Sequence, residues 1–271
     1  MRASSQAALR AGAERWEPVL REVGEDARGF GEQLYGVADT LHGSGSLRRA
    51  LTDPSRDGED KAKLARAVFA PHAASQVVDL IAGLVRSRWS QDDDLAEAVE
   101  ELATTSILAA AQSREKLLQV EEELFLVERL LADNRELRRR LTDAEVPVAD
   151  RLAVVEKLLG SRVEVETRIL FDRLVATASA GTLSAGLTRI GRLAASRRDR
   201  LVASVIAAAP LSRSQEERLA NILQRQYGRP VHVNVALDPE IIGGLQVQIG
   251  ADVIDGTMLT RLNDARRRFH G

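Results

Sequence analysis

The fold class is decided by residues Leu84–Val146, which read LVRSRWSQDDDLAEAVEELATTSILAAAQSREKLLQVEEELFLVERLLADNRELRRRLTDAEV. This stretch contains neither Gly, which weakens helices, nor Pro, which stops them. Along it, apolar residues recur at the spacings that place them on one face of an amphipathic helix. These residues are Leu95, Ala98, Leu102, Ala109, Leu117, Val120, Leu124, Val127 and Leu131. The pattern predicts a mainly α-helical protein.

Within this stretch, residues 92–132 are predicted to form one long helix. Ser90 is a suitable N-cap, and Asp92–Asp94 follow where negative charge favours the helix N-terminus. At about 1.5 Å per residue, the helix would be roughly 60 Å long. The apolar stripe shifts by one position between its halves, as a straight helix drifts against a heptad. The alternative is two ordinary bundle helices joined by a tight break near Ala111–Ser113.

The chain also contains an internal repeat. The block Leu137–Asp143 (LRRRLTD) repeats Leu47–Asp53 (LRRALTD) with six identities, at an offset of 90 residues. The same offset pairs apolar residues of the preceding helices, namely Phe30 with Val120, Leu34 with Leu124, Val37 with Val127 and Leu41 with Leu131. This similarity predicts a duplicated helical unit. Each copy is expected to close its own small bundle, because two copies are too few for an open solenoid.

Other helices of the two units follow from the same kind of pattern. Ala7–Val23 is predicted to be helical, with an interruption at Pro18. A second helix is predicted to end at His42–Gly45, where Gly suits a left-handed cap. Leu183, Leu187, Ile190 and Leu193 predict the last helix of the second bundle.

After residue 198 the pattern becomes mixed. Alternating or continuous apolar residues predict strands over 201–209, 231–237, 245–249 and 253–254. Helices are predicted over 213–227, which opens with a Ser212–Gln215 capping box, and over 258–269. The order strand, helix, three strands and helix predicts a compact α+β module.

The predicted architecture is therefore mainly α, with two related helical bundle units joined by a long helix and a small C-terminal α+β domain. We expect three domains. The first helical repeat unit covers residues 1–91, the long helix and second bundle cover 92–198, and the α+β module covers 199–271.

Composition excludes several classes of site. The chain has no Cys, so disulfides, thiolate nucleophiles and Cys-based zinc sites are excluded. The formal net charge of -2 and the aromatic content of 3% argue against a nucleic-acid-binding protein. No apolar run approaches the ~20 residues that span a bilayer, and the N-terminus leads into no apolar signal segment. We expect an intracellular, soluble protein that can still bind a membrane-bound partner.

No catalytic, cofactor-binding or metal site is predicted. The four His residues, at positions 42, 72, 232 and 270, form no i,i+4 pair. Gly43–Ser46 lacks the Lys of a phosphate-binding loop. Two Arg triplets, 138–140 and 266–268, are interpreted as solvated helix faces. A connector is therefore favoured over an enzyme, and a helical adaptor or RNA-associated scaffold is the alternative.

The C-terminal module carries a specific motif. It reads VALDPEIIGGL over 235–245 and DVIDGT over 252–257, and Arg261–Leu262 follow. This order resembles the end of the F-type ATP synthase delta subunit, called OSCP in mitochondria. The resemblance covers residues 100 to 271, approximately. Its motif positions are interpreted as architectural and are Asp238, Pro239, Gly243, Gly244, Asp255 and Gly256.

The segment before residue 100 resembles the extended actinobacterial form of this family, in which an extra copy of half of the helical unit precedes the delta portion. In some of those proteins the extra copy follows a membrane-anchored b-type subunit, and this chain is similar to a stand-alone version.

The resemblance implies a non-catalytic cap of the peripheral stalk, present in one copy per complex during proton-driven ATP synthesis. The helical domain would bind N-terminal helices of the alpha subunits, and the C-terminal module would meet the distal ends of the b-type subunits. The implied location is peripheral, on the cytoplasmic face of the cell membrane. No nucleic acid and no cofactor is implied.

Overall fold

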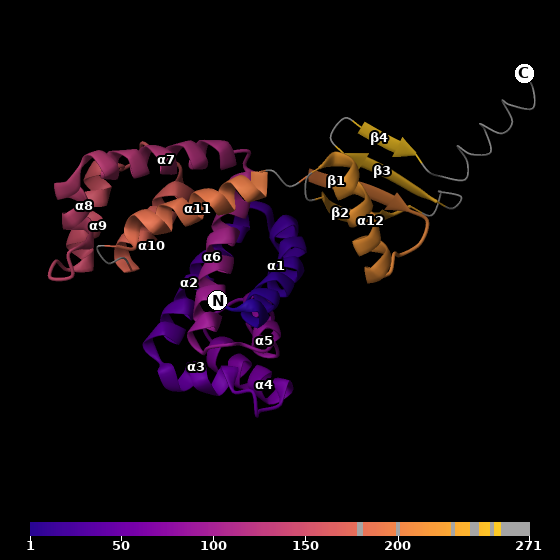
Figure 1. The fold of residues 1–271 in the computed structure, drawn as a ribbon, viewed down its shortest axis with the longest axis horizontal. Helices are drawn as coiled ribbons and strands as arrows, with labels where there is room; N and C mark the ends of the chain where they lie inside the picture. Colours follow the sequence, from indigo (N-terminus) through magenta and orange to yellow (C-terminus); the bar gives the residue numbers. More distant parts are fainter. Residues whose placement is uncertain (178–180, 199–200, 229–230, 239–243, 250–251, 256–271) are drawn as a thin grey trace, which may run out of the picture. The chain divides into compact units, whose positions relative to one another are not determined.

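The structure is a computed structural model, and it describes residues 1–177, 181–198, 201–228, 231–238, 244–249 and 252–255. The chain divides into two compact units, Met1–Ala195 and Ser196–Gly271. Helices dominate the first, and the second combines a small sheet with a helix (Figure 1). The predicted fold class, mainly α with a small C-terminal α+β part, is confirmed.

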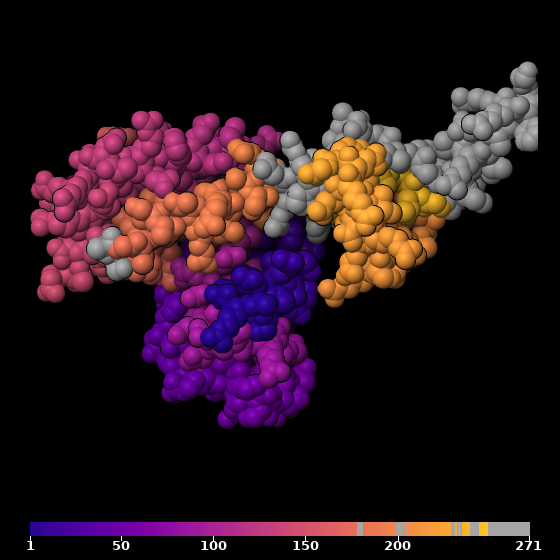
Figure 2. Space-filling model, in the orientation of Figure 1, coloured from indigo at the N-terminus to yellow at the C-terminus, as the bar shows by residue number. Residues whose placement is uncertain are grey.

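The helical part begins with the elements of the first copy. They are α1 (Ala3–Val23), the 3-10 helix η1 (Gly24–Asp26), α2 (Ala27–Gly43), α3 (Gly45–Thr52), α4 (Gly58–Phe69) and α5 (Ser75–Val85). The helices that follow are α6 (Asp93–Ser113), α7 (Leu117–Asp133), α8 (Arg135–Thr142), α9 (Val148–Leu158), α10 (Val165–Thr177) and α11 (Leu183–Arg198). In Figure 2 the magenta surface of α7 forms an outer edge of this unit.

The 90-residue offset is reproduced by the starts of the helices. Residues 3, 27, 45, 58, 75 and 93 begin α1 to α6, and residues 93, 117, 135, 148, 165 and 183 begin α6 to α11. Each start in the second series lies 90 residues after its counterpart in the first. The predicted duplication is therefore present in the fold.

Helix α6 occurs in both series. It is the last helix of the first copy and the first helix of the second. It packs against α1 and α2 of the first copy, and against α7 and α10 of the second. A helix with neighbours on several sides needs apolar or small residues around most of its circumference. Accordingly, α6 buries Leu95, Ala98, Val99, Leu102, Ala103, Ile107, Leu108, Ala110 and Ala111.

The predicted long helix over 92–132 is wrong, and the alternative of two helices is correct. Helix α6 ends at Ser113 and α7 starts at Leu117. Between them Glu115 adopts a left-handed backbone conformation with φ of 58°. The N–H of Lys116 donates to the carbonyl of Ala111 at 2.8 Å, which ends the helical ladder. In the first copy, α1 ends at Val23, which lies 90 residues before Ser113. Gly24, the residue after Val23, also has φ of 58°.

The predicted interruption at Pro18 is also wrong, because α1 continues through it to Val23. Pro removes one helical hydrogen bond and crowds the preceding turn. Burial of the side chains before and after Pro18 compensates for this cost, since Trp16 and Leu20 are each only 2% exposed. The indole N–H of Trp16 also donates to the hydroxyl of Ser106 on α6, at 2.8 Å.

Helices α2 and α6 approach each other closely because small residues lie between them. Ala27, Ala38 and Ala103 are fully buried. A Cβ atom added to Gly31 would lie 2.6 Å from Cδ1 of Ile107 and 3.0 Å from the carbonyl oxygen of Ala103. Gly at position 31 therefore allows the close contact.

The second unit contains β1 (Leu201–Ala207), α12 (Arg213–Tyr227), β2 (Val231–Leu237), β3 (Leu245–Ile249) and β4 (Asp252–Asp255). The strand order in the sheet is β2-β1-β3-β4. Strand β1 pairs in parallel with β2 and antiparallel with β3, and β3 pairs antiparallel with β4. Helix α12 makes the crossover that a parallel pair requires.

Helix α12 has the predicted bounds, because both of its ends carry clear signals. At its start, the side chain of Gln215 accepts a hydrogen bond from the N–H of Ser212 at 2.8 Å, as a capping box requires. At its end, Gly228 adopts the left-handed cap with φ of 67°. The predicted helix over 258–269 lies outside the described residues.

Candidate functional site

The described residues contain no group of three or more His, Cys, Asp or Glu side chains that could hold a metal ion. In the same part of the chain, no helix is long and apolar enough to cross a membrane. The candidate functional features of this part of the chain are contacts between the two copies and exposed surfaces.

One polar cluster joins the copies, and we call it the junction cluster (Tyr35, Asp39, Glu100, Thr104 and Arg173). Arg173 of α10 donates to Glu100 on α6 at 2.8 and 2.6 Å and to Asp39 on α2 at 2.7 Å. Its guanidinium also lies over the ring of Tyr35, with the central carbon 4.8 Å from the ring centroid. Three helices from both copies are thus held by one side chain.

Ionisation in the junction cluster follows from burial and pairing. Burial disfavours the charged form of Arg173, but hydrogen bonds and charges from Glu100 and Asp39 outweigh this effect and raise its pKa. Burial also raises the pKa of the Tyr35 hydroxyl well above its ordinary value, although a hydrogen bond with Thr104 opposes the shift. At neutral pH the cluster therefore holds a charged Arg beside a neutral Tyr.

A cavity of about 700 Å³ lies beside this cluster, between helices of the two copies. Its wall includes Asp39, Glu100, Arg173 and Arg189. These side chains are paired, since Arg189 donates to Glu101 at 2.8 Å and the other three belong to the junction cluster. The charged wall thus supports the junction between the copies.

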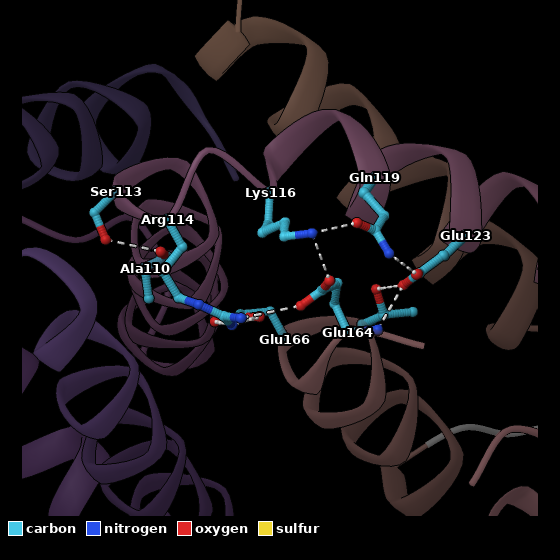
Figure 3. Close-up of polar contacts among 9 residues, drawn as sticks. Ala110, Ser113, Arg114, Lys116, Gln119, Glu123, Glu164 and Glu166 are labelled. Carbon is cyan, nitrogen blue, oxygen red and sulfur yellow. Dashed lines mark hydrogen bonds and ion pairs between the residues drawn. The ribbon is translucent and has the colours of Figure 1, made fainter. Parts of the chain in front are cut away.

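A second polar network holds the turn between α6 and α7 against the start of α10 (Figure 3). Arg114 donates to Glu166 at 2.9 Å and to Glu164 at 3.2 Å. Lys116 pairs with Glu164 at 3.2 Å. The hydrogen bond with Glu166, strengthened by its charge, raises the pKa of Arg114. Glu123 completes the network by accepting the backbone N–H of Glu164 at 2.9 Å.

One of these contacts recurs in the first copy. The N–H of Ala74 donates to Gln33 at 2.8 Å, and these residues lie 90 positions before Glu164 and Glu123. The duplication therefore preserved individual hydrogen bonds as well as helices.

The Arg triplet 138–140 is partly explained by the same offset. Arg138 donates to the carbonyl oxygen of Leu131 at 2.9 Å, and Arg48 donates to that of Leu41 at 2.7 Å. Arg138 thus caps the C-terminal end of α7, whereas Arg139 and Arg140 are exposed. The second triplet, 266–268, lies outside the described residues.

The motif positions of the C-terminal module are only partly described. The N–H of Asp238, just after β2, donates to the carbonyl oxygen of Ala207 at 3.0 Å. Gly244 precedes β3 with φ of 93°, a conformation that favours Gly. Asp255 is the last residue of β4. The remaining positions, Pro239, Gly243 and Gly256, lie outside the described residues.

Sequence reasoning missed one surface. Leu118, Phe125, Leu126 and Leu130 lie on α7 and are 53%, 58%, 61% and 36% exposed. Their signal was the surplus of apolar residues in α7 beyond the stripe that the core uses. We call these four residues the α7 stripe.

Comparison with known proteins gives a consistent result over the whole chain. Residues 103–269 match the family model described as ATP synthase delta (OSCP) subunit. The "ATP synthase subunit delta" of Beutenbergia cavernae is 52% identical over 271 residues, which are 100% of both chains. That of Streptomyces coelicolor is 44% identical over 99% of this chain and 98% of its own. That of Kineococcus radiotolerans is 38% identical over 98% of this chain and 97% of its own.

These three relatives match the region before residue 103 as well, so the first copy of the repeat lies within the matched length. The chain belongs to the ATP synthase delta (OSCP) subunit family.

Proposed function

We propose that the chain is a non-catalytic subunit of the peripheral stalk of F-type ATP synthase. In this role it connects the catalytic head to the b-type stalk subunits and resists the torque of the rotor during proton-driven ATP synthesis. The match of the whole chain to delta subunits carries the proposal. In the proposed role, the chain itself catalyses no chemical step.

The helical unit is suited to bearing load. Because α6 belongs to both copies, the two bundles share one packed element and no flexible linker separates them there. Close-packed interiors have low compressibility and transmit strain. The junction cluster adds charge-assisted hydrogen bonds between Arg173 and the carboxylates of Asp39 and Glu100. A force applied to one copy would thus reach the other with little internal movement.

The finer assignment of partners is part of the proposal. The helical domain would bind N-terminal helices of the alpha subunits, and the C-terminal module, residues 199–271, would meet the distal ends of the b-type subunits. One copy would serve each complex. The chain would lie peripherally at the cytoplasmic face of the cell membrane, held there by the complex.

Deletion of the gene for this chain provides the test. Membranes from the deletion strain should release the catalytic head during a low-salt wash, and they should lose ATP synthesis driven by a proton gradient. Adding the purified chain back should restore both. A tagged chain should also co-purify with alpha and b-type subunits. If membranes without the chain keep the head bound and coupled, the proposal is wrong.

A further inference from the structure

Helix α7 has two apolar faces, of which the core uses only one. The buried face consists of Leu117, Val120, Leu124, Val127 and Leu131, each at most 6% exposed. The α7 stripe lies outside this face, on the outer edge of the helical unit, and its four side chains are 36% to 61% exposed (Figure 2). Neighbouring apolar side chains left in solvent mark a surface that contacts another molecule.

Two opposite charges flank the centre of the α7 stripe. Glu122 lies three residues before Phe125, and Arg129 lies three residues after Leu126. Both charged side chains are exposed, and neither has a hydrogen bond or an ion pair within the part of the chain that the structure describes. Spacings of three and four place Leu118, Glu122, Phe125 and Arg129 along one side of the helix. The outer face of α7 thus carries one charge of each sign at equal distances from an apolar centre.

A face with this arrangement is complementary to itself. When two copies of α7 lie antiparallel, with a twofold axis between Phe125 and Leu126, each Glu122 lies opposite the partner's Arg129. The apolar pair at the centre then packs on its own counterpart, as an isologous interface requires. A helix with charges of a single sign would be attracted at one end of the stripe and repelled at the other. The mixed charge of α7 therefore favours a second α7 as the occupant.

The first copy of the repeat lacks this self-complementarity. On α2, 90 residues earlier, Glu32 and Asp39 occupy the positions of Glu122 and Arg129. Tyr35 and Gly36 occupy the centre, and Tyr35 is only 7% exposed. Antiparallel pairing of two α2 helices would place acidic residues opposite each other and would leave no apolar centre. The pattern is specific to the second copy, so the common helical fold does not account for it.

From this pattern we infer that the free chain forms a homodimer through the α7 stripe, with the two α7 helices antiparallel about a twofold axis. Helix α7 has 17 residues and is about 25 Å long. One helix of this length from each copy gives an interface below the standard size of about 800 Å² per partner, so the dimer dissociates with a constant on the order of 10 µM. The inference goes beyond the proposed function, in which one copy serves each complex, because it concerns the chain before assembly.

Sedimentation velocity of the full chain tests whether the dimer forms. Between about 1 µM and about 200 µM, the wild type should pass from the mass of one chain to twice that mass. Glu122→Arg and Arg129→Glu should each raise the dissociation constant about tenfold or more, because each brings two pairs of like charges together. Their melting temperatures should stay at the wild-type value, since both side chains are exposed.

Charge exchange tests the antiparallel register. An equimolar mixture of Glu122→Arg and Arg129→Glu should form heterodimers, because every facing pair then has opposite charges. The double variant Glu122→Arg/Arg129→Glu should form homodimers as tightly as the wild type does. The control Glu32→Arg, at the equivalent position of α2, should leave the dimer unchanged.

Three results would overturn the inference. The first is a wild type that stays monomeric up to about 200 µM. The second is a dimer that neither single charge reversal weakens, which would place the interface elsewhere on the chain. The third is a failure of the mixture and the double variant to restore dimers. None of these results bears on the proposed function, which is tested on membranes from the deletion strain.

Discussion

Arg173 covers the ring of Tyr35, with its guanidinium carbon 4.8 Å from the ring centroid, although the two residues lie in different copies of the repeat. An aromatic face attracts a cation in this position. The same guanidinium donates hydrogen bonds to the carboxylates of Asp39 on α2 and Glu100 on α6. Contacts of this kind join the two copies into one compact unit. Both copies accordingly lie within the unit Met1–Ala195.

Replacement of Arg173 by Met should lower the free energy of unfolding by about 2 kcal/mol, because charge-assisted hydrogen bonds to Glu100 and Asp39 are lost. Urea denaturation followed by circular dichroism measures the change. Arg213→Met is the control, since Arg213 is an exposed Arg that pairs with Glu217, and it should cost less than about 1 kcal/mol. Equal losses in the two variants would contradict a special role for Arg173.

A matched pair of glycine substitutions tests the close packing of α2 on α6. Gly31→Ala should destabilise the chain by about 1–3 kcal/mol, because its methyl group meets Ile107 and the carbonyl oxygen of Ala103. Gly29→Ala, in the same helix but with open space around the added atom, should stabilise it by about 0.5–1 kcal/mol. Thermal unfolding measures both. The same sign for the two variants would show that the helices are not packed as described.

The buried hydroxyl of Tyr35 predicts a specific sensitivity to alkali. Burial raises its pKa in the folded chain above that in the unfolded chain, so the folded state holds the proton more tightly. Its contribution to stability is complete below the unfolded pKa of about 10 and is lost as the pH rises further. Tyr35→Phe should remove this part of the alkaline loss, whereas the control Tyr227→Phe should keep it. Urea midpoints between pH 8 and pH 11 provide the measurement.

Gly244→Val should destabilise the C-terminal unit by about 1–3 kcal/mol, because Val must adopt the positive φ of 93° seen at this position. Limited proteolysis should then cut within β1–β3 faster than in the wild type. The control is Ala236→Val, at an exposed position of β2, where a β-branched residue suits the strand. Unchanged protection in Gly244→Val would mean that the turn tolerates a side chain.

Where local signals were strong, the sequence was sufficient to predict the structure. Helix α12 was predicted with its observed ends, because Ser212 and Gly228 mark them. The repeat was visible in seven residues and proved to govern every helix start from α1 to α11.

The break between α6 and α7 was predicted only as the alternative to one long helix, for a physical reason. It is made by Glu115, which has neither the absent Cβ of Gly nor the ring of Pro to signal it. The offset of 90 residues could have revealed it, because Gly24 interrupts the first copy beside the equivalent position. Contacts such as Arg173–Asp39 join residues 134 positions apart and depend on how the copies pack. Nothing in the local pattern predicts them.

Because α6 belongs to both copies, it determines which segment must be repeated to lengthen a chain of this kind. The duplicated segment contains five helices, because the last helix of the first bundle, α6, is also the first helix of the second. Helix α11 occupies the place in the second bundle that α6 occupies in the first. A third bundle could therefore be added after α11 by one more copy of the 90-residue segment, with α11 as the first helix of the new bundle.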